Sequence, residues 1–257
     1  MEYLKWSTEN RIATITIAKG PANALSSQVL KELALVLNEI EQDENVRVIL
    51  IHGEGRFFSA GADIKEFTTI ENGEQFSDLA RLGQNLFERM ENFEKPIIAA
   101  IHGAALGGGL ELAMACHFRL VTETAKLGLP ELSLGLIPGF AGSQRLPRYV
   151  GTALAAEMLL TSKPITGVEA VQAGLANHAY PEEQLLENAY KIAGQIAKKS
   201  PIAIKAILEL FNYNKPEKFH AGVEREAVLF GQVFESADGQ EGITAFIDKR
   251  EPNFVGK

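Results

Sequence analysis

The sequence predicts an α/β fold with a mainly parallel sheet, followed by a helical C-terminal region. Largely aliphatic runs at residues 46–51 and 97–101 have the length and composition of strands that are covered on both faces. Amphipathic helical segments alternate with these strands, which favours parallel pairing with right-handed crossovers. Beyond Ser143 the pattern is mostly helical, and these helices keep enough apolar residues to pack on the main domain or on another subunit.

The chain begins with two predicted strands and a long helix. Residues 11–17 alternate apolar and polar side chains with period two, and residues 3–7 supply an antiparallel partner across a turn at 8–10. Ser26 or Ser27 is expected to cap the helix that follows. The apolar face of this helix has helical spacing: Val29, Leu30, Leu33, Leu37 and Ile40.

The middle of the chain continues the strand and helix alternation. A second helix is predicted at 75–93, ending before Lys95 and Pro96, and strands are predicted at 97–101 and 118–121. Glycine and proline punctuate the following stretch, so we expect a loop-rich segment at 125–142. Four of the later helices are predicted at 182–198, 202–211, 220–234 and 242–249.

Composition is that of an ordinary globular protein and disfavours several classes of partner. The chain has 257 residues, of which 46% are hydrophobic and 23% charged, enough for one large core or one domain with a small appendage. A formal net charge of −8 disfavours nucleic acid and anionic membranes as primary partners, whereas an anionic small ligand stays compatible with it. No leader pattern and no bilayer-length apolar stretch is visible. The single Cys116, expected to be a small buried residue, fits a reducing compartment, so we expect a cytoplasmic protein.

Three consecutive glycines mark the segment with the clearest chemical signature. The strand at 97–101 leads into the glycines 107–109, and a helix with Glu111 in its first turn follows. Glycines leave backbone N–H groups accessible to a ligand, and a helix N-terminus adds unpaired donors and positive dipole. A carboxylate beside such a site indicates acid–base chemistry on a carbonyl compound. The alternative is that Glu111 only complements the helix N-terminus.

A second loop has the same accessible backbone. Residues 57–65 follow the strand at 46–51 and contain a run of small residues at 59–62. Since ligands bind beyond the carboxyl ends of parallel strands, N–H groups from this loop and from the triple glycine can converge as an oxyanion hole. The alternative is that Gly61 and Asp63 merely form a turn and cap a helix.

Glu131 is the second candidate for proton transfer. It follows Pro130 among apolar neighbours, which can hold a carboxylate in a dry site, and the alternative is an exposed residue in the first turn of a helix. The five histidines form no i,i+4 pair and no cluster with cysteine, so no metal site is expected. The sequence also contains no serine-hydrolase elbow, no phosphate loop and no dinucleotide fingerprint.

These segments resemble the enoyl-CoA hydratase (crotonase) family over essentially the whole chain. The motifs that carry the resemblance keep the family's order: 59–65, 98–111, 129–131, 135–139 and 245–250. The resemblance implies the crotonase fold, in which ββα repeats form a spiral of mainly parallel sheets with a helical region at the C-terminus. It places the α/β core at 1–198 and a C-terminal helical oligomerisation region at 199–257.

The resemblance also implies roles for individual residues. The amides of Ala62 and Gly108 would form an oxyanion hole around the carbonyl of an acyl-CoA thioester, and Glu111 and Glu131 match the family's two hydratase carboxylates. The backbone amide of Gly139 would help to hold the reacting water. Contacts to the CoA moiety are implied for Ala60, Ala62, Asp63, Ile64 and Lys65.

Two positions depart from the family pattern. Phe140 stands where many hydratases have a small residue, and its ring can narrow the acyl pocket, which leaves the preferred chain length open. His102 stands where asparagine is frequent, and we expect no catalytic consequence from it.

The activity implied is the reversible syn hydration of a trans-2-enoyl-CoA to a 3-hydroxyacyl-CoA, with CoA as part of the substrate and no separate cofactor. An enoyl-CoA isomerase or another acyl-CoA lyase on the same fold is the main rival, and a hydration assay separates it. A glycosidase is disfavoured because one tryptophan and five tyrosines offer few sugar-stacking platforms. A non-catalytic oligomeric or nucleic-acid-binding protein is the third rival, and the acidic net charge disfavours nucleic-acid binding.

The C-terminal helices, by the same resemblance, mediate a trimer or a dimer of trimers. Lys249 is then placed to reach a CoA phosphate or the adenine, from the same subunit or a neighbour. The sequence leaves open the acyl length, the product stereochemistry, and whether the route is fatty-acid β-oxidation, amino-acid breakdown or another.

Overall fold

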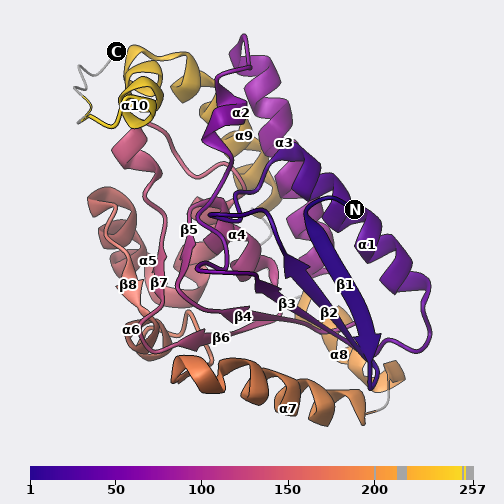
Figure 1. Ribbon diagram of the computed structural model, residues 1–257. Helices are drawn as coiled ribbons and strands as arrows, with labels where there is room; N and C mark the ends of the chain where they lie inside the picture. Colours follow the sequence, from indigo (N-terminus) through magenta and orange to yellow (C-terminus); the bar gives the residue numbers. More distant parts are fainter. Residues whose placement is uncertain (200, 213–218, 251, 253–257) are drawn as a thin grey trace.

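The computed structural model describes residues 1–199, 201–212, 219–250 and 252 (Figure 1). Strands and helices alternate through the first two thirds of the chain, and helices make up nearly all of the last third. The strands are β1 Leu4–Glu9, β2 Ile12–Ile17, β3 Val48–Gly53, β4 Ile97–Ile101, β5 Ala104–Leu106, β6 Phe118–Thr122, β7 Lys126–Gly128, β8 Ile165–Thr166 and β9 His178–Tyr180. The α-helices are α1 Ser27–Gln42, α2 Ile64–Phe67, α3 Gly73–Glu91, α4 Gly108–Ala115, α5 Gly142–Thr161, α6 Gly167–Gln172, α7 Leu185–Ala197, α8 Pro201–Asn212, α9 Phe219–Glu235 and α10 Ala237–Ile247, with 3-10 turns η1 Glu131–Leu134 and η2 Glu182–Gln184.

The main sheet has the order β1-β2-β3-β4-β6-β9. β1 pairs antiparallel with β2, and every following pair in this sheet is parallel. The predicted mainly parallel sheet is therefore confirmed. The hairpin turns at Asn10 and Arg11, both at positive φ, so residues 8 and 9 belong to β1 and not to the turn as the sequence suggested.

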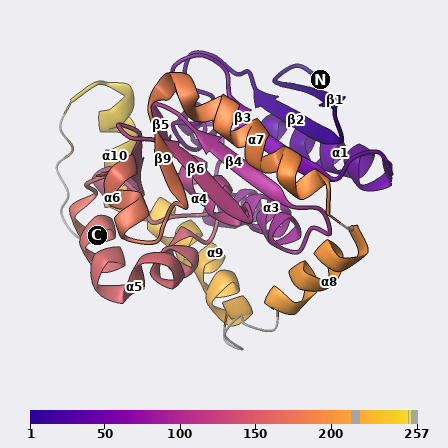
Figure 2. The same cartoon turned by 90° about the horizontal axis from the view of Figure 1, so that it is seen from below.

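The central strands are buried on both faces, as their aliphatic composition predicts. Ile49 and Ile51 point into the core that contains the apolar faces of α1, α3 and α4. Val48 and Leu50 point to the other side, where α7 packs. Figures 1 and 2 show α7 along that face of the strands, with α1, α3 and α4 on the opposite face.

A second, three-stranded sheet has the order β5-β7-β8, with β5 and β7 parallel and β8 antiparallel. The sequence predicts only loop in this region, so the short strand β7 corrects the expected loop-rich segment 125–142. An isolated bridge between Ser59 and Ala105 ties the 57–65 loop to this sheet. The 57–65 loop follows β3, and β5 with the glycines after it follows β4. The second sheet thereby holds these two segments side by side.

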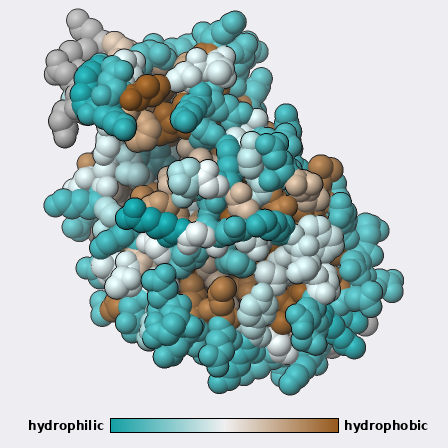
Figure 3. All heavy atoms as spheres, viewed as in Figure 1, coloured by the Kyte–Doolittle hydropathy of each residue, from teal (hydrophilic) through white to brown (hydrophobic). Residues whose placement is uncertain are grey.

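The C-terminal helices pack against the core in the described part of the chain. Phe76 of α3 contacts Phe230 and Phe234 of α9 at ring-centroid distances of 4.3 and 4.1 Å. α10 lies against η1, and a side chain at Gly242 would overlap the carbonyl oxygen of Leu134. The α10 end exposes apolar residues, visible as a brown patch in Figure 3. No helix among the described residues has the length and apolar character needed to cross a bilayer.

Candidate active site

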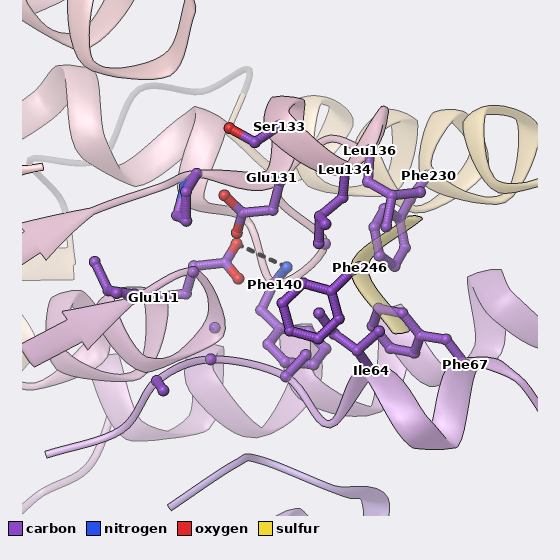
Figure 4. A pocket seen from close by; sticks show the side chains of 18 of the residues that line it. Ile64, Phe67, Glu111, Glu131, Ser133, Leu134, Leu136, Phe140, Phe230 and Phe246 are labelled. Atoms are coloured by element: carbon purple, nitrogen blue, oxygen red, sulfur yellow. Dashed lines mark hydrogen bonds between the residues drawn. The ribbon is translucent and has the colours of Figure 1, made fainter. Parts of the chain in front are cut away.

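A cavity of about 410 Å³ opens at the carboxyl ends of the strands and collects most of the predicted site residues (Figure 4). Its wall comes from the 60–67 loop, the start of α4, η1, the 139–140 turn, α9 and α10. The predicted residues that line it are Ala60, Ala62, Ile64, Gly108, Glu111, Glu131 and Gly139. Asp63 and Lys65, predicted to contact CoA, do not line it.

The amides of Ala62 and Gly108 lie close together at the N-terminus of α4. Leu25 donates its N–H to the carbonyl of Gly61 at 2.8 Å and accepts from the N–H of Asp63 at 3.2 Å. Because this parallel bridge uses the peptide groups on either side of Ala62, the N–H of Ala62 points to the other side of the loop. A Cβ built on Gly108 would stand 3.3 Å from the nitrogen of Ala62, which measures how closely the two backbones approach.

Both amides are available to a ligand. Gly108 is the first residue of α4, whose N-cap Gly107 offers no side chain, so its N–H has no acceptor within the helix. In the part of the chain that the structure describes, neither the N–H of Ala62 nor that of Gly108 donates to a protein acceptor. Two donors aimed at one region beside a helix N-terminus can stabilise a developing oxyanion.

Glycine is required where the two loops meet. A side chain at Gly109 would overlap the carbonyl oxygen of Ser59, and Gly107 has a φ of 50°, in the left-handed region. The N–H of Gly107 donates to the carbonyl of Gly128 in β7 at 2.9 Å, and the hydroxyl of Ser59 donates to the carbonyl of Asn23 at 2.8 Å. These bonds fix both loops, so the amide pair is preorganised before any ligand binds.

Glu111 occupies the fourth position of α4 and is 1% exposed. Its Oε1 accepts hydrogen bonds from the N–H groups of Phe140 at 2.8 Å and Gly142 at 2.7 Å. The carboxylate is thus held by the 139–142 turn and not by its own helix. The alternative, that Glu111 only complements the N-terminus of α4, does not describe these contacts. A buried carboxylate needs such donors, because burial without them is costly.

The turn that holds Glu111 is anchored by buried side chains. Gln84 of α3 donates to the carbonyl of Gly139 at 2.8 Å. Arg145 of α5, 1% exposed, donates to the carbonyl of Phe140 at 2.6 Å and forms an ion pair with Glu91 at 2.8 Å. Sequence reasoning missed these three side chains, since each is a polar residue inside a helix with no motif to mark it.

Glu131 begins η1 directly after Pro130 and is half-buried. In Figure 4 its carboxyl group and that of Glu111 point toward one another across the cavity. The bare backbone of Gly107 leaves room for it, since a Cβ there would stand 3.0 Å from Oε1 of Glu131. The structure therefore brings the two predicted carboxylates to one place, beside the amide pair.

Phe140 forms part of the cavity wall and is 3% exposed. Its ring packs edge-on against Phe87 at a centroid distance of 5.5 Å. A side chain at Gly83 would collide with this ring, and a Cβ at Gly108 would stand 3.1 Å from it, so the two glycines leave room for the ring. The ring takes up space in the site beside the start of α4.

Apart from Ser133, the remaining wall is apolar. Ile64 and Phe67 come from α2, and Leu134 and Leu136 come from η1 and the segment after it. Phe230 and Phe246 come from α9 and α10. Within the described residues, the two glutamates are the only charged side chains that line the cavity. Sequence reasoning did not single out Phe230, because one phenylalanine in a helical pattern carries no chemical signal.

Asp63 has a local role that the sequence had left as its alternative. Its Oδ1 accepts from the N–H of Lys65 at 3.2 Å and caps α2, and its Oδ2 forms an ion pair with Lys19 at 2.5 Å. Lys65 is exposed, and Lys249 is exposed just beyond α10. The CoA contacts expected of these residues stay predictions.

Other titratable groups lie outside the cavity. Cys116 is buried, and burial raises the pKa of its thiol to about 12, so the thiol stays protonated at neutral pH. Burial lowers the pKa of His52. No group of three His, Cys, Asp or Glu side chains suited to a metal ion occurs in the described ranges.

Comparison with known proteins gives one consistent family. Residues 7–257 match the model of the family described as "Enoyl-CoA hydratase/isomerase". A "Probable enoyl-CoA hydratase" of Bacillus subtilis (strain 168) is 55% identical over 258 residues, covering 100% of both chains. A "Short-chain-enoyl-CoA hydratase" of Clostridium acetobutylicum is 40% identical and covers 95% of this chain and 94% of its own. The crystal structure of an enoyl-CoA hydratase from Bacillus anthracis covers 99% of this chain and 100% of its own, with a TM-score of 0.79 and 35% identity, and confirms the expected crotonase-like fold.

Proposed function

Because the chain belongs to the enoyl-CoA hydratase/isomerase family, we propose that it is an enoyl-CoA hydratase. It adds water reversibly and in the syn sense to a trans-2-enoyl-CoA and gives the 3-hydroxyacyl-CoA. The observation that carries this proposal is the pair of facing carboxylates, Glu111 and Glu131, beside two available amides in one apolar cavity. The relatives named as hydratases support the same reaction.

The amides of Ala62 and Gly108 bind the thioester carbonyl oxygen in this proposal. When the water oxygen bonds to C3, the electron pair of the C2=C3 double bond is delocalised onto the thioester oxygen. Hydrogen-bond donors at that oxygen therefore stabilise the enolate-like transition state. Loss of one such donor typically raises the barrier by ~3–4 kcal/mol. The preorganised loops described above suit this role, since the donors need no rearrangement as charge develops.

The two carboxylates divide the proton transfers. Glu111 orients the water and accepts its proton as the water oxygen bonds to C3, and the protonated carboxyl group of Glu131 delivers a proton to C2. Proton exchange between the two facing carboxyl groups then restores the starting state, so the water supplies both the hydroxyl group and the added hydrogen. The backbone amide of Gly139 is proposed to help to hold the water. An isomerase needs one group to move a proton between two carbons, so a second carboxylate beside the first favours hydration over isomerisation.

The lining of the cavity favours an apolar acyl chain without a terminal charge. No described cationic side chain lines the wall, and a distal carboxylate would be buried among phenylalanines at considerable cost. Phe140 limits the depth of the site, which suits short chains. The CoA moiety is proposed to run along the 60–65 loop, past Ala60, Asp63, Ile64 and Lys65, and no further cofactor is needed.

The assembly and location also belong to this proposal. Exposed apolar side chains occur on α8 and on α10, among them Ile207, Phe211, Phe246 and Ile247. Such surfaces suit burial between subunits, so we propose a trimer or dimer of trimers formed through the 199–257 region, in which Lys249 approaches CoA. The single cysteine supports a cytoplasmic protein.

A spectrophotometric assay tests the proposal. The purified protein is mixed with crotonyl-CoA, and loss of the conjugated thioester absorbance is followed. We expect multiple turnovers without added cofactor, and product that carries a 3-hydroxyl group. Conversion of a 3-enoyl-CoA to the 2-enoyl-CoA with no hydration would instead identify an isomerase.

A further inference from the structure

Gln84 is a buried amide on α3 that does not itself line the cavity but hydrogen-bonds to the turn that holds Glu111. Its side chain is 2% exposed, and its Nε2 donates to the carbonyl oxygen of Gly139 at 2.8 Å. We propose that Gln84 is a positioning residue for hydration, acting on Glu111 through the Gly139–Phe140 peptide group. This inference rests on the proposed hydratase function.

One peptide group connects the two side chains. The carbonyl of Gly139 and the N–H of Phe140 belong to the same planar unit and point in opposite directions. Gln84 binds the oxygen end, and the nitrogen end donates to Oε1 of Glu111 at 2.8 Å. Fixing the oxygen therefore fixes the donor, and the hydrogen bond from Gln84 polarises the unit so that it binds the carboxylate more strongly.

Arg145 anchors the same turn by a different route. It donates to the carbonyl of Phe140, which belongs to the next peptide group along the chain. That contact sets the course of the turn but does not act on the 139–140 peptide group, whose N–H is one of the two donors to Glu111. Gln84 is thus the side chain that acts on this donor directly.

The turn needs such anchors because its conformation is unfavourable by itself. Ala141 has a φ of 70°, in the left-handed region that non-glycine residues rarely adopt, and it caps α5 without a side-chain hydrogen bond. A small rotation of the 139–140 peptide would move the donor away from Glu111. Misplacing a catalytic group by a fraction of an ångström lowers turnover while leaving the CoA contacts unchanged.

Gln84→Met tests the proposal, because methionine keeps the length and volume of the side chain and removes the amide. We expect kcat for crotonyl-CoA to fall about tenfold and KM to stay within about twofold. The matched control is Ser77→Ala, two turns earlier on the same helix. Ser77 is 7% exposed and also donates to a backbone carbonyl, that of Ala227 at 2.8 Å, so its loss should lower stability and leave kcat unchanged.

A double-mutant cycle with Glu111→Gln separates positioning from general destabilisation. If Gln84 acts through Glu111, Gln84→Met lowers the residual kcat of the Glu111→Gln enzyme by less than about twofold. An equal tenfold loss in both backgrounds, or no loss in the wild-type background, overturns the inference. Gln84→Asn, whose shorter amide falls out of reach, is the replacement if the methionine variant does not fold. A wild-type protein that fails to hydrate crotonyl-CoA contradicts the proposed function itself, which distinguishes the two failures.

Discussion

Two pairs of backbone amides face the same site, and they differ in what they bind. Within the described residues, the amides of Ala62 and Gly108 donate to no protein acceptor, whereas those of Phe140 and Gly142 both donate to Oε1 of Glu111. The first pair is therefore available to a ligand, and the second pair positions a carboxylate. The comparison shows that a pair of neighbouring backbone N–H groups can bind a ligand or position a side chain. Which of the two it does depends on whether a protein carboxylate already accepts its hydrogen bonds.

The carboxylate pair gives the largest expected effect. Glu111→Gln and Glu131→Gln each remove one acid–base group and keep its size, so kcat for crotonyl-CoA should fall by about 10²–10⁴-fold. Binding of the acyl-CoA, followed by calorimetry with a saturated analogue, should change little. Normal hydration by either folded variant removes that glutamate from the mechanism.

Gly108→Ala obstructs the two amides that are available to a ligand, those of Ala62 and Gly108. The added methyl would stand 3.1 Å from the ring of Phe140 and 3.3 Å from the nitrogen of Ala62, so it enters the place proposed for the thioester oxygen. We expect kcat/KM to fall about 100-fold or more, because both donors are obstructed. Gly194→Ala, a helical glycine with open space around its Cβ, is the control that should keep full activity.

Gly142→Ala disturbs the other two amides, those of Phe140 and Gly142, which donate to Glu111. Its methyl would stand 2.8 Å from Oε1 of Glu111 and must displace that carboxylate or the turn. We expect about a 10- to 100-fold fall in kcat with little change in KM, which contrasts with the kcat/KM loss of Gly108→Ala. Equal effects of the two variants on KM would contradict the division of roles between the pairs.

Phe140→Ala sharpens the comparison by changing the space between the pairs. Removal of a ring that is 3% exposed should lower the free energy of unfolding by about 3–5 kcal/mol. The deeper site should raise the ratio of kcat/KM for an eight-carbon enoyl-CoA to that for crotonyl-CoA. An unchanged ratio in a folded variant shows that the ring does not limit chain length.

Asp63 gives the smallest expected effect. Asp63→Ala removes the cap of α2 and the ion pair with Lys19, and should cost about 1 kcal/mol in a thermal melt. Asp63→Asn keeps a capping oxygen and should leave both stability and KM near the wild-type values. A large KM increase for the asparagine variant would show that the charge itself contacts CoA.

The sequence predicted the parts of the fold that local patterns determine. The apolar face of α1 and the aliphatic strands β3 and β4 follow from side-chain periodicity, and Ser26 caps α1 as its position suggests. The strands β5, β7 and β8 have only two or three residues, too few for a period to show. Their pairing depends on contacts between distant segments, which one sequence does not display.

The candidate site divides in the same way. Ala62, Gly108, Glu111 and Glu131 lie in motifs whose order along the chain marks the family, and the structure brings them together. No sequence motif identifies the residues that hold the site in place. Arg145, for example, sits in a helix like any surface arginine, and only the fold shows that it is buried against the carbonyl of Phe140.

The most direct test is a crystal structure of the enzyme with acetoacetyl-CoA. The quantities to measure are the distances from the thioester oxygen to the backbone nitrogens around it. We predict that this oxygen lies about 2.7–3.1 Å from the nitrogens of both Ala62 and Gly108, with C3 between the carboxylates of Glu111 and Glu131. A thioester oxygen bound elsewhere, with either amide turned to solvent, would contradict the account.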